Sequence, residues 1–175
     1  MSAKELPSPE LLRQLLRYDP DTGKLYWRER SNPENSNAKN TWNKRWAGKL
    51  ALDYIDPSNG YRVGRLMNRR AYAHRVILAI YSGRHPEEVD HINGDRADNR
   101  IKNLRACSRL ENCKNLKKPK DNTSGHIGVS KKGNGWRARI FDIHLGTFKN
   151  LDEAIAARKE AEAKYGFHPN HGRSQ

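Results

Sequence analysis

The stretch that decides the fold of this chain is VDHINGDRADNRIKNLRACSRLEN, residues 89–112. Its first residues, 89–92, read as the end of a strand, and Asn93-Gly94 is a strong turn signal. Residues 104–107 can return as a second strand. Residues 108–111, Ser-Arg-Leu-Glu, fit the capping-box pattern that opens a helix. The stretch therefore predicts a unit of two strands joined by a loop and followed by a helix.

The side chains within this unit suit phosphodiester hydrolysis. An attacking water must lose a proton, and His91 offers a base whose ordinary pKa lies near neutrality. A divalent cation must neutralise phosphate charge, and Mg²⁺ takes hard oxygen donors while keeping most of its waters. Asp90 supplies a carboxylate, and Asn112, in the first turn of the helix, supplies an amide oxygen. Because neighbouring strand residues point to opposite faces, Asp90 and His91 can serve one phosphate only if the strand ends there.

The flanking sequence predicts further elements on the N-terminal side. Leucines at helical spacing after Ser8, with Pro9 at the first helical position, predict a helix over residues 8–18. The other expected elements are a turn at 19–23, a strand at 24–27, a mobile loop at 31–45, a hairpin over 61–72 that turns near Asn68, and a helix over 73–83 that ends at Gly83.

The charge of the chain indicates a polyanionic partner. Its 175 residues carry 34 Lys and Arg against 20 acids, a formal net charge of +14, with only 35% hydrophobic residues. Residues 62–120 hold fifteen basic and six acidic groups, and this surplus of nine predicts phosphate contact. The composition argues against a neutral metabolic enzyme. The sequence has no apolar run of 18 residues, so no membrane-spanning helix is expected, and its N-terminal residues lack the apolar stretch of a signal peptide. The two cysteines, Cys107 and Cys113, are expected to be reduced thiols.

A second unit is expected after the basic linker. Strand patterns at 126–130, 136–141 and 144–148 precede an Ala-rich helix pattern at 151–165. The alternation predicts that Trp136, Ala138 and Ile140 face this helix. The opposite face should then carry Arg137, Arg139 and Phe141.

The central stretch resembles the HNH nuclease motif, the ββα-metal finger. The resemblance rests on Asp90-His91, Asn103 and Asn112, and on the flanking segments GYRVGRLMNRRAYAHRV and RLENCKN, which look like phage and homing-type HNH endonucleases. It covers roughly residues 18–116. It implies that His91 activates water, that Asp90 and Asn112 hold the metal, and that Asn103 braces the loop by hydrogen bonds to backbone.

Two details refine the expected site. The last motif position is Asn112 rather than His, and a neutral amide ligand favours Mg²⁺, or Mn²⁺, over tightly held Zn²⁺. Arg105 is a candidate to reach the scissile phosphate, the alternative being a plain surface residue of the strand. His74 lies in an apolar helix pattern, where a histidine is more often structural.

The C-terminal part, residues 122–166, resembles the AP2/ERF DNA-binding domain. The matching pieces are Ser124-Gly125, Gly128-Val129, Trp136-Arg137-Ala138, Leu145-Gly146-Thr147-Phe148 and the Ala-rich helix. Such domains lay a three-stranded sheet in the major groove. The resemblance implies DNA contacts by Ser130, Lys132, Arg137, Arg139, His144 and Thr147. The sequence leaves open a small α+β domain that makes protein contacts instead.

Together these observations predict an α+β protein that cleaves double-stranded DNA. The expected domains are an N-terminal region at 1–60 that packs on the nuclease, an HNH domain at 61–118, a linker at 119–121, the AP2-like domain at 122–168 and a tail at 169–175. The expected function is a metal-dependent HNH endonuclease that nicks DNA in the cytoplasm of a bacterial or phage-infected cell, associated with the nucleoid. The alternatives are a DNA-binding regulator with a structural HNH finger and a protein directed to RNA. The oligomeric state is open, and the sequence is compatible with a monomer.

Overall fold

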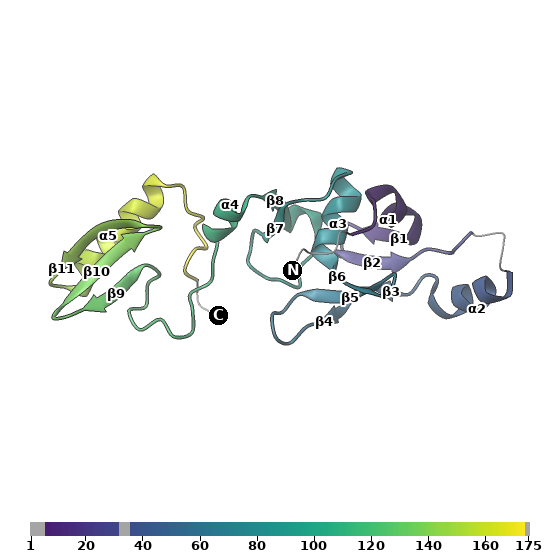
Figure 1. Cartoon of the computed structure of the whole chain (residues 1–175), viewed down its shortest axis with the longest axis horizontal. Helices are drawn as coiled ribbons and strands as arrows, with labels where there is room; N and C mark the ends of the chain where they lie inside the picture. The colour runs from purple at the N-terminus through teal and green to yellow at the C-terminus, as the bar shows by residue number, and fades with distance from the viewer. Residues whose placement is uncertain (1–5, 32–35, 174–175) are drawn as a thin grey trace. The chain divides into compact units, whose positions relative to one another are not determined.

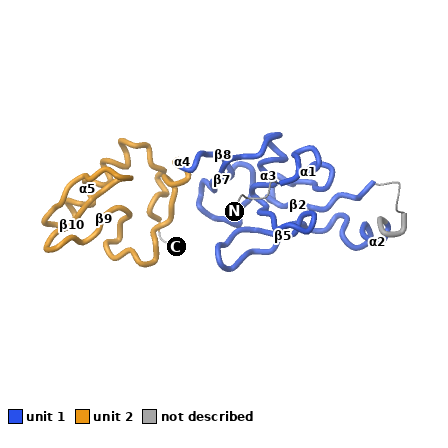
Figure 2. The backbone as a smooth tube through the Cα atoms, viewed as in Figure 1, with its two compact units in different colours: residues 1–109 blue, residues 110–175 orange. Residues whose placement is uncertain are grey.

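The computed structural model of the chain describes residues 6–31 and 36–173, with only the backbone described at 36–39. The chain forms two compact units, residues 1–109 and 110–175, which are coloured separately in Figure 2. Secondary structure is mixed, with short antiparallel sheets and separate helices (Figure 1), so the fold is α+β as predicted. None of the helices in the described ranges is long and apolar enough to cross a membrane.

The N-terminal unit contains three small antiparallel sheets and three α-helices among its described residues. The sheets have the strand orders β1-β2-β3, β4-β5-β6 and β7-β8. Its elements are α1 Pro9–Leu15, β1 Leu16–Asp19, β2 Lys24–Trp27, α2 Ser36–Trp46, β3 Leu50–Ala51, β4 Tyr54–Ile55, β5 Arg62–Leu66, β6 Arg69–Tyr72, α3 Ala73–Ser82, β7 Glu88–His91, the 3-10 turn η1 Ile101–Asn103 and β8 Leu104–Cys107.

Helix α3 is the centre of the N-terminal unit. It packs against α1, β5, β6, β7 and β8. Val76, Ile77 and Ala79 are fully buried in one core cluster with Leu12 of α1. The helix ends at Gly83 in a left-handed conformation (φ 73°), as the sequence predicts. Since the same cluster includes residues of β7 and β8, α3 ties the candidate site to the main core.

The first helix is shorter than predicted. Ser8 caps α1 by accepting a hydrogen bond from the Leu11 amide (3.3 Å), as expected. The helix ends at Leu15, however, because Leu16 takes an extended conformation and pairs with Trp27 in β1–β2. The Leu16 side chain is buried in the core from that strand, so helical leucine spacing was misleading at this position.

The segment predicted as a mobile loop at 31–45 contains helix α2, so that prediction was wrong from Ser36 onward; residues 32–35 lie outside the described part. The polar composition of α2 lacks an apolar stripe and resembles a loop. Packing by Trp42 supplies the missing contacts. Its ring meets Trp27 edge-on at 5.7 Å, and the Arg30 guanidinium lies 3.9 Å from its centroid.

The C-terminal unit has the predicted order of three strands and a helix. Its elements are β9 Val129–Lys132, β10 Gly135–Ile140, β11 Ile143–Phe148 and α5 Leu151–Lys164, with the short helix α4 Arg109–Cys113 at the junction of the two units. The sheet order is β11-β10-β9, and α5 packs on one sheet face around Val129, Ala138 and Ala154. The first strand begins at Val129 rather than His126. Gly128 has φ 79° and lies so close to Arg139 that an added Cβ would be 2.5 Å from its carbonyl oxygen.

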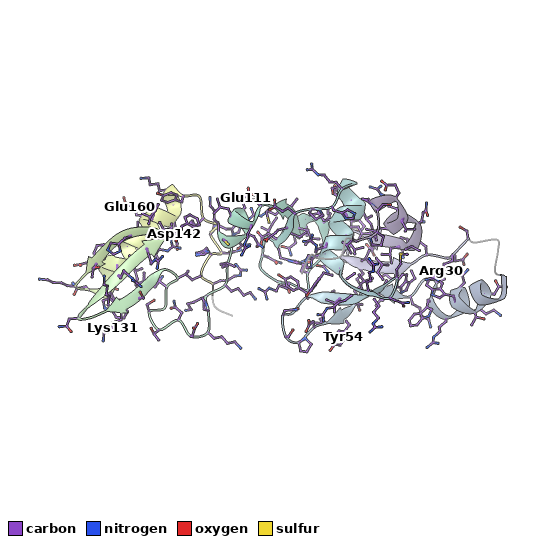
Figure 3. All side chains as sticks on the ribbon, in the orientation of Figure 1. Arg30, Tyr54, Glu111, Lys131, Asp142 and Glu160 are labelled. Atoms are coloured by element: carbon purple, nitrogen blue, oxygen red, sulfur yellow. The ribbon has the colours of Figure 1, made fainter. Side chains whose placement is uncertain are left out.

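Phe141 is not part of the exposed sheet face, contrary to the prediction. It lies in the turn after β10 beside Asp142 (labelled in Figure 3) and has a left-handed φ of 49°. Its ring packs against Phe167 at 5.4 Å and Tyr165 at 6.2 Å. Strand alternation stops at Ile140, so the expected pattern failed one residue later.

Candidate active site

The candidate site lies on the two-stranded ribbon formed by β7 and β8. Asp90 pairs with Arg105, and His91 pairs with Leu104. Strand β7 ends at His91, and the chain then turns through Gly94 (φ 73°), whose amide donates to the His91 carbonyl at 2.8 Å. The strand therefore ends where the sequence requires it to end if Asp90 and His91 are to serve one phosphate.

His91 is buried and hydrogen-bonds to Asn99. The residue is 4% exposed, and its Nε2 lies 2.9 Å from Oδ1 of Asn99. An amide oxygen only accepts, so Nε2 carries the hydrogen and Nδ1 is the basic nitrogen. Burial lowers the pKa of His91, although the Asn99 bond and Asp90 oppose this shift. A neutral imidazole is the form that a general base requires.

Aromatic rings surround His91 on the side of α3 and β5. The His74 ring meets it edge-on at 5.2 Å, and the Tyr61 ring lies at 5.8 Å. His74 is itself buried, its Nδ1 has no partner among the described atoms, and burial lowers its pKa to about 3, with His91 as the next cause. Arg96 stacks over Tyr61 at 4.9 Å. His74 thus contacts the candidate base directly rather than serving the core alone.

Asp90 and Arg105 form an ion pair across the ribbon. The Nε and Nη2 atoms of Arg105 donate to the same oxygen, Oδ2 of Asp90, at 2.9 and 2.7 Å. The carboxylate side chain is 7% exposed and the arginine side chain 39% exposed. Arg105 is therefore neither a plain surface residue nor committed wholly to Asp90, since over a third of it is open to solvent.

Asn103 bridges the loop between β7 and β8. Its Oδ1 accepts from the Asn93 amide at 2.9 Å, and its Nδ2 donates to the Asp98 carbonyl at 2.7 Å. The Ile92 amide also donates to the Asn103 carbonyl at 2.9 Å. These bonds join the two ends of the loop that follows His91. The bracing role that the HNH resemblance implies for Asn103 in the reaction stays a prediction.

Asn99 is the site residue that the sequence reasoning missed. Its residue type and its place in the loop predict only a turn or cap residue, yet its side chain hydrogen-bonds to His91 and the residue is 1% exposed. Local sequence offers no signal for this contact, because it depends on the path of the loop. The buried Nδ2 of Asn99 has no partner among the described atoms.

The structure describes the surroundings of one predicted metal ligand, Asp90, and leaves the role of the other, Asn112, as a prediction. Asp90 offers a buried carboxylate, and carboxylate plus amide oxygen is a hard donor set that fits Mg²⁺. Within residues 6–31 and 36–173, no group of three His, Cys, Asp or Glu side chains could hold a metal ion, so a closed zinc-type cage is not built from them. Asn112 lies on α4 in the other compact unit, and its part in the site stays a prediction.

Six residues predicted to contact DNA lie on the sheet of the C-terminal unit. Ser130, Arg137 and Thr147 form one cross-strand row, Arg139 pairs with His144 in the next, and Lys132 pairs with Gly135. A register shift separates the two rows after Ala138. The face that carries these side chains is opposite to the one covered by α5, and four of the six are exposed: Lys132, Arg139, His144 and Thr147.

Comparison with known proteins bears on the central ribbon. A family model of HNH endonucleases matches residues 71–114, from the end of β6 to just beyond α4. No curated protein and no solved structure matches the chain. The matched segment ends before the C-terminal sheet and α5, so the AP2/ERF resemblance of that part stays a prediction. The segment that carries Asp90, His91 and Asn103 is therefore similar to HNH endonucleases, which indicates a nuclease or DNA-binding function.

Proposed function

We propose that this chain is a metal-dependent HNH endonuclease that hydrolyses phosphodiester bonds in double-stranded DNA. The observation that carries the proposal is His91 itself. It is a buried, neutral imidazole with its hydrogen fixed on Nε2, and it directly follows a buried carboxylate within the segment similar to HNH endonucleases. A basic nitrogen prepared in this way suits proton removal from water.

Each neighbouring residue has a distinct part in the proposed reaction. His91 takes the proton of the attacking water through Nδ1. Asn103 keeps the loop closed, so that the end of β7 stays in place. Arg105 neutralises Asp90 in the free protein and reaches the scissile phosphate with its exposed end.

Asp90 and Asn112 would hold the divalent cation, Mg²⁺ or Mn²⁺. When bound, the cation supplies charge neutralisation on the phosphate and on the leaving oxygen. A single carboxylate and a neutral amide make a weak ligand set, which predicts that activity needs free metal in solution. Asn112→Ala should raise the Mg²⁺ concentration for half-maximal activity, whereas an unchanged midpoint would remove Asn112 from the ligand set.

The C-terminal sheet is proposed as a second DNA contact of the AP2 type. Support comes from the cross-strand rows of Ser130, Arg137 and Thr147 and from exposed Arg139 and Lys132. The double variant Lys132→Ala/Arg139→Ala should weaken binding in gel shifts. Lys159→Ala/Lys164→Ala, which changes two exposed lysines on α5, is the matched control. Equal affinity of the two variants would count against DNA binding by this face.

Plasmid nicking tests the proposed activity. Supercoiled plasmid is incubated with the full chain and Mg²⁺ or Mn²⁺, with EDTA as the metal-free control. We expect nicked circles that disappear with EDTA and with His91→Ala, and that persist with His85→Ala, which changes an exposed histidine. Tight DNA binding without nicking under either metal would refute the enzyme and favour the DNA-binding regulator.

A further inference from the structure

The turn of the N-terminal hairpin lies directly on the backbone of Asn99. The Tyr18 hydroxyl, at the end of β1, donates to the Asn99 carbonyl at 2.9 Å. Across the same turn, a Cβ added to Gly23 would lie 2.6 Å from the carbonyl carbon of Asn99 and 2.5 Å from the amide nitrogen of Arg100. The hairpin therefore touches this backbone at two points.

The hairpin is itself stiff at this end. Gly23 is buried with φ 71°, and its amide donates to the Asp19 carbonyl at 2.9 Å. The Asp19 carboxylate accepts from the amides of Asp21 and Thr22 at 3.1 and 3.3 Å. Burial raises the pKa of Tyr18 to about 12, so its hydroxyl keeps the hydrogen that it donates. A fixed donor and a fixed surface thus meet the Asn99 backbone.

The Asn99 side chain transmits this constraint to His91. Its Oδ1 lies 2.9 Å from Nε2 of His91, and the residue is 1% exposed, so a shift of its backbone moves the acceptor. The two neutral tautomers of histidine differ only in which nitrogen holds the hydrogen. The partner of one nitrogen decides which of the two is present.

We propose that the β1–β2 hairpin is a positioning device for His91, with Tyr18 and Gly23 acting through Asn99. The proposal rests on the proposed function, in which Nδ1 of His91 accepts the proton. It gives the N-terminal hairpin a part in catalysis that passes through Asn99. Displacement of Asn99 allows the hydrogen to move to Nδ1, and that form of His91 presents no base to the water. Such a change slows the chemical step and leaves DNA binding intact.

Two glycines provide a matched test. Gly23→Ala and Gly48→Ala place the same methyl group at left-handed positions of similar φ, 71° and 75°. Only the Gly23 methyl would meet the Asn99–Arg100 backbone, because nothing lies within 4 Å of a Cβ at Gly48. We expect Gly23→Ala to lower the single-turnover nicking rate about 10- to 100-fold at saturating protein, and Gly48→Ala to leave it within about 2-fold.

Tyr18→Phe is the milder second variant, in case Gly23→Ala fails to fold. It removes one hydroxyl and should lower the same rate about 3- to 10-fold, with unchanged affinity in a gel shift. Equal nicking rates for Tyr18→Phe and wild type, or equal rates for the two glycine variants, would overturn the proposal. A loss of affinity that accounts for the whole loss of rate would overturn it as well.

The tautomer of His91 gives a readout that does not need activity. Two-bond ¹H–¹⁵N correlation spectra distinguish the two neutral forms, and the His91 signals are those lost in His91→Gln. We expect the Nε2–H form in wild type and Gly48→Ala, and a mixture in Tyr18→Phe and Gly23→Ala. The same form in all four proteins would refute the positioning role. A wild type that shows these shifts but never nicks DNA would refute the proposed activity instead.

Discussion

The buried histidine pair makes the stability of the N-terminal unit depend on pH, and His74→Phe should remove much of that dependence. Burial, followed by the nearby His91, Arg75 and Arg96, lowers the pKa of His74 to about 3 from an ordinary value of 6.5. The unfolded chain therefore binds a proton at pH 5, which the folded unit does not. The folded unit loses stability as pH falls below 6.5, and the loss continues until pH approaches 3.

The size of the effect follows from the two pKa values. At pH 5 the unfolded histidine lies about 1.5 pH units below its pKa, and each unit corresponds to about 1.4 kcal/mol. The free energy of unfolding should therefore fall by about 2 kcal/mol between pH 7.5 and pH 5 because of His74 alone. Phe carries no proton and keeps a ring against Tyr61 and Tyr72, which lie 4.7 and 5.6 Å from the His74 ring.

Urea unfolding followed by tryptophan fluorescence measures this difference. Trp27, Trp42 and Trp46 lie in the N-terminal unit and Trp136 in the other, so a Trp136→Phe background reports on the N-terminal unit. The loss of stability between pH 7.5 and pH 5 should be about 2 kcal/mol smaller in His74→Phe than in its parent. Parallel stability curves for the two proteins would refute the neutral state assigned to His74.

Three further outcomes test the packing and the charge of the protein. Leu12→Ala should lower the unfolding free energy of the N-terminal unit by about 3 kcal/mol in urea titrations, because the side chain is fully buried against α3. Arg158→Ala should lower the unfolding free energy of the C-terminal unit by about 3 kcal/mol, measured by circular dichroism during denaturant unfolding, because it removes a partner of the Ile127 carbonyl and of Glu162. Arg158→Met should recover part of that loss. Affinity for DNA should fall steeply with salt in gel shifts, and Lys132→Ala/Arg139→Ala should reduce the slope of log affinity against log salt by about 2.

Most helices and strands could be predicted wherever the residue pattern fits only one type of element. The β5–β6 hairpin, α3 with its terminal Gly83, and the ribbon at residues 88–107 follow from alternation, helical spacing and turn residues. The prediction failed at Leu16, because adjacent leucines fit a helix and a buried strand equally well. It failed again in α2, where tryptophan packing rather than an apolar stripe stabilises a polar helix.

Some residues of the candidate site could be predicted from a local pattern, and others could not. Asp90, His91 and Asn103 lie within one short motif, so spacing sufficed to propose them. Asn99 contacts His91 only because the loop folds back, and its backbone is fixed by Tyr18, 81 residues away in sequence. His74 reaches His91 because α3 packs on β7. Contacts of this kind depend on tertiary packing, which no local pattern encodes.

The small size of the β7–β8 ribbon limits how the site could be transferred to another protein. A two-stranded sheet on its own is at best marginally stable in water. This ribbon is stable because Val89 and Leu104 join the core organised by α3. Residues 88–113 alone, inserted into another protein, should therefore remain unfolded even though every motif residue is present. The smallest segment that could be transferred with the proposed site is the whole N-terminal unit extended through α4, because Asn112 lies beyond the end of that unit. Recombination between related proteins should therefore preserve the ends of this extended segment rather than those of the motif.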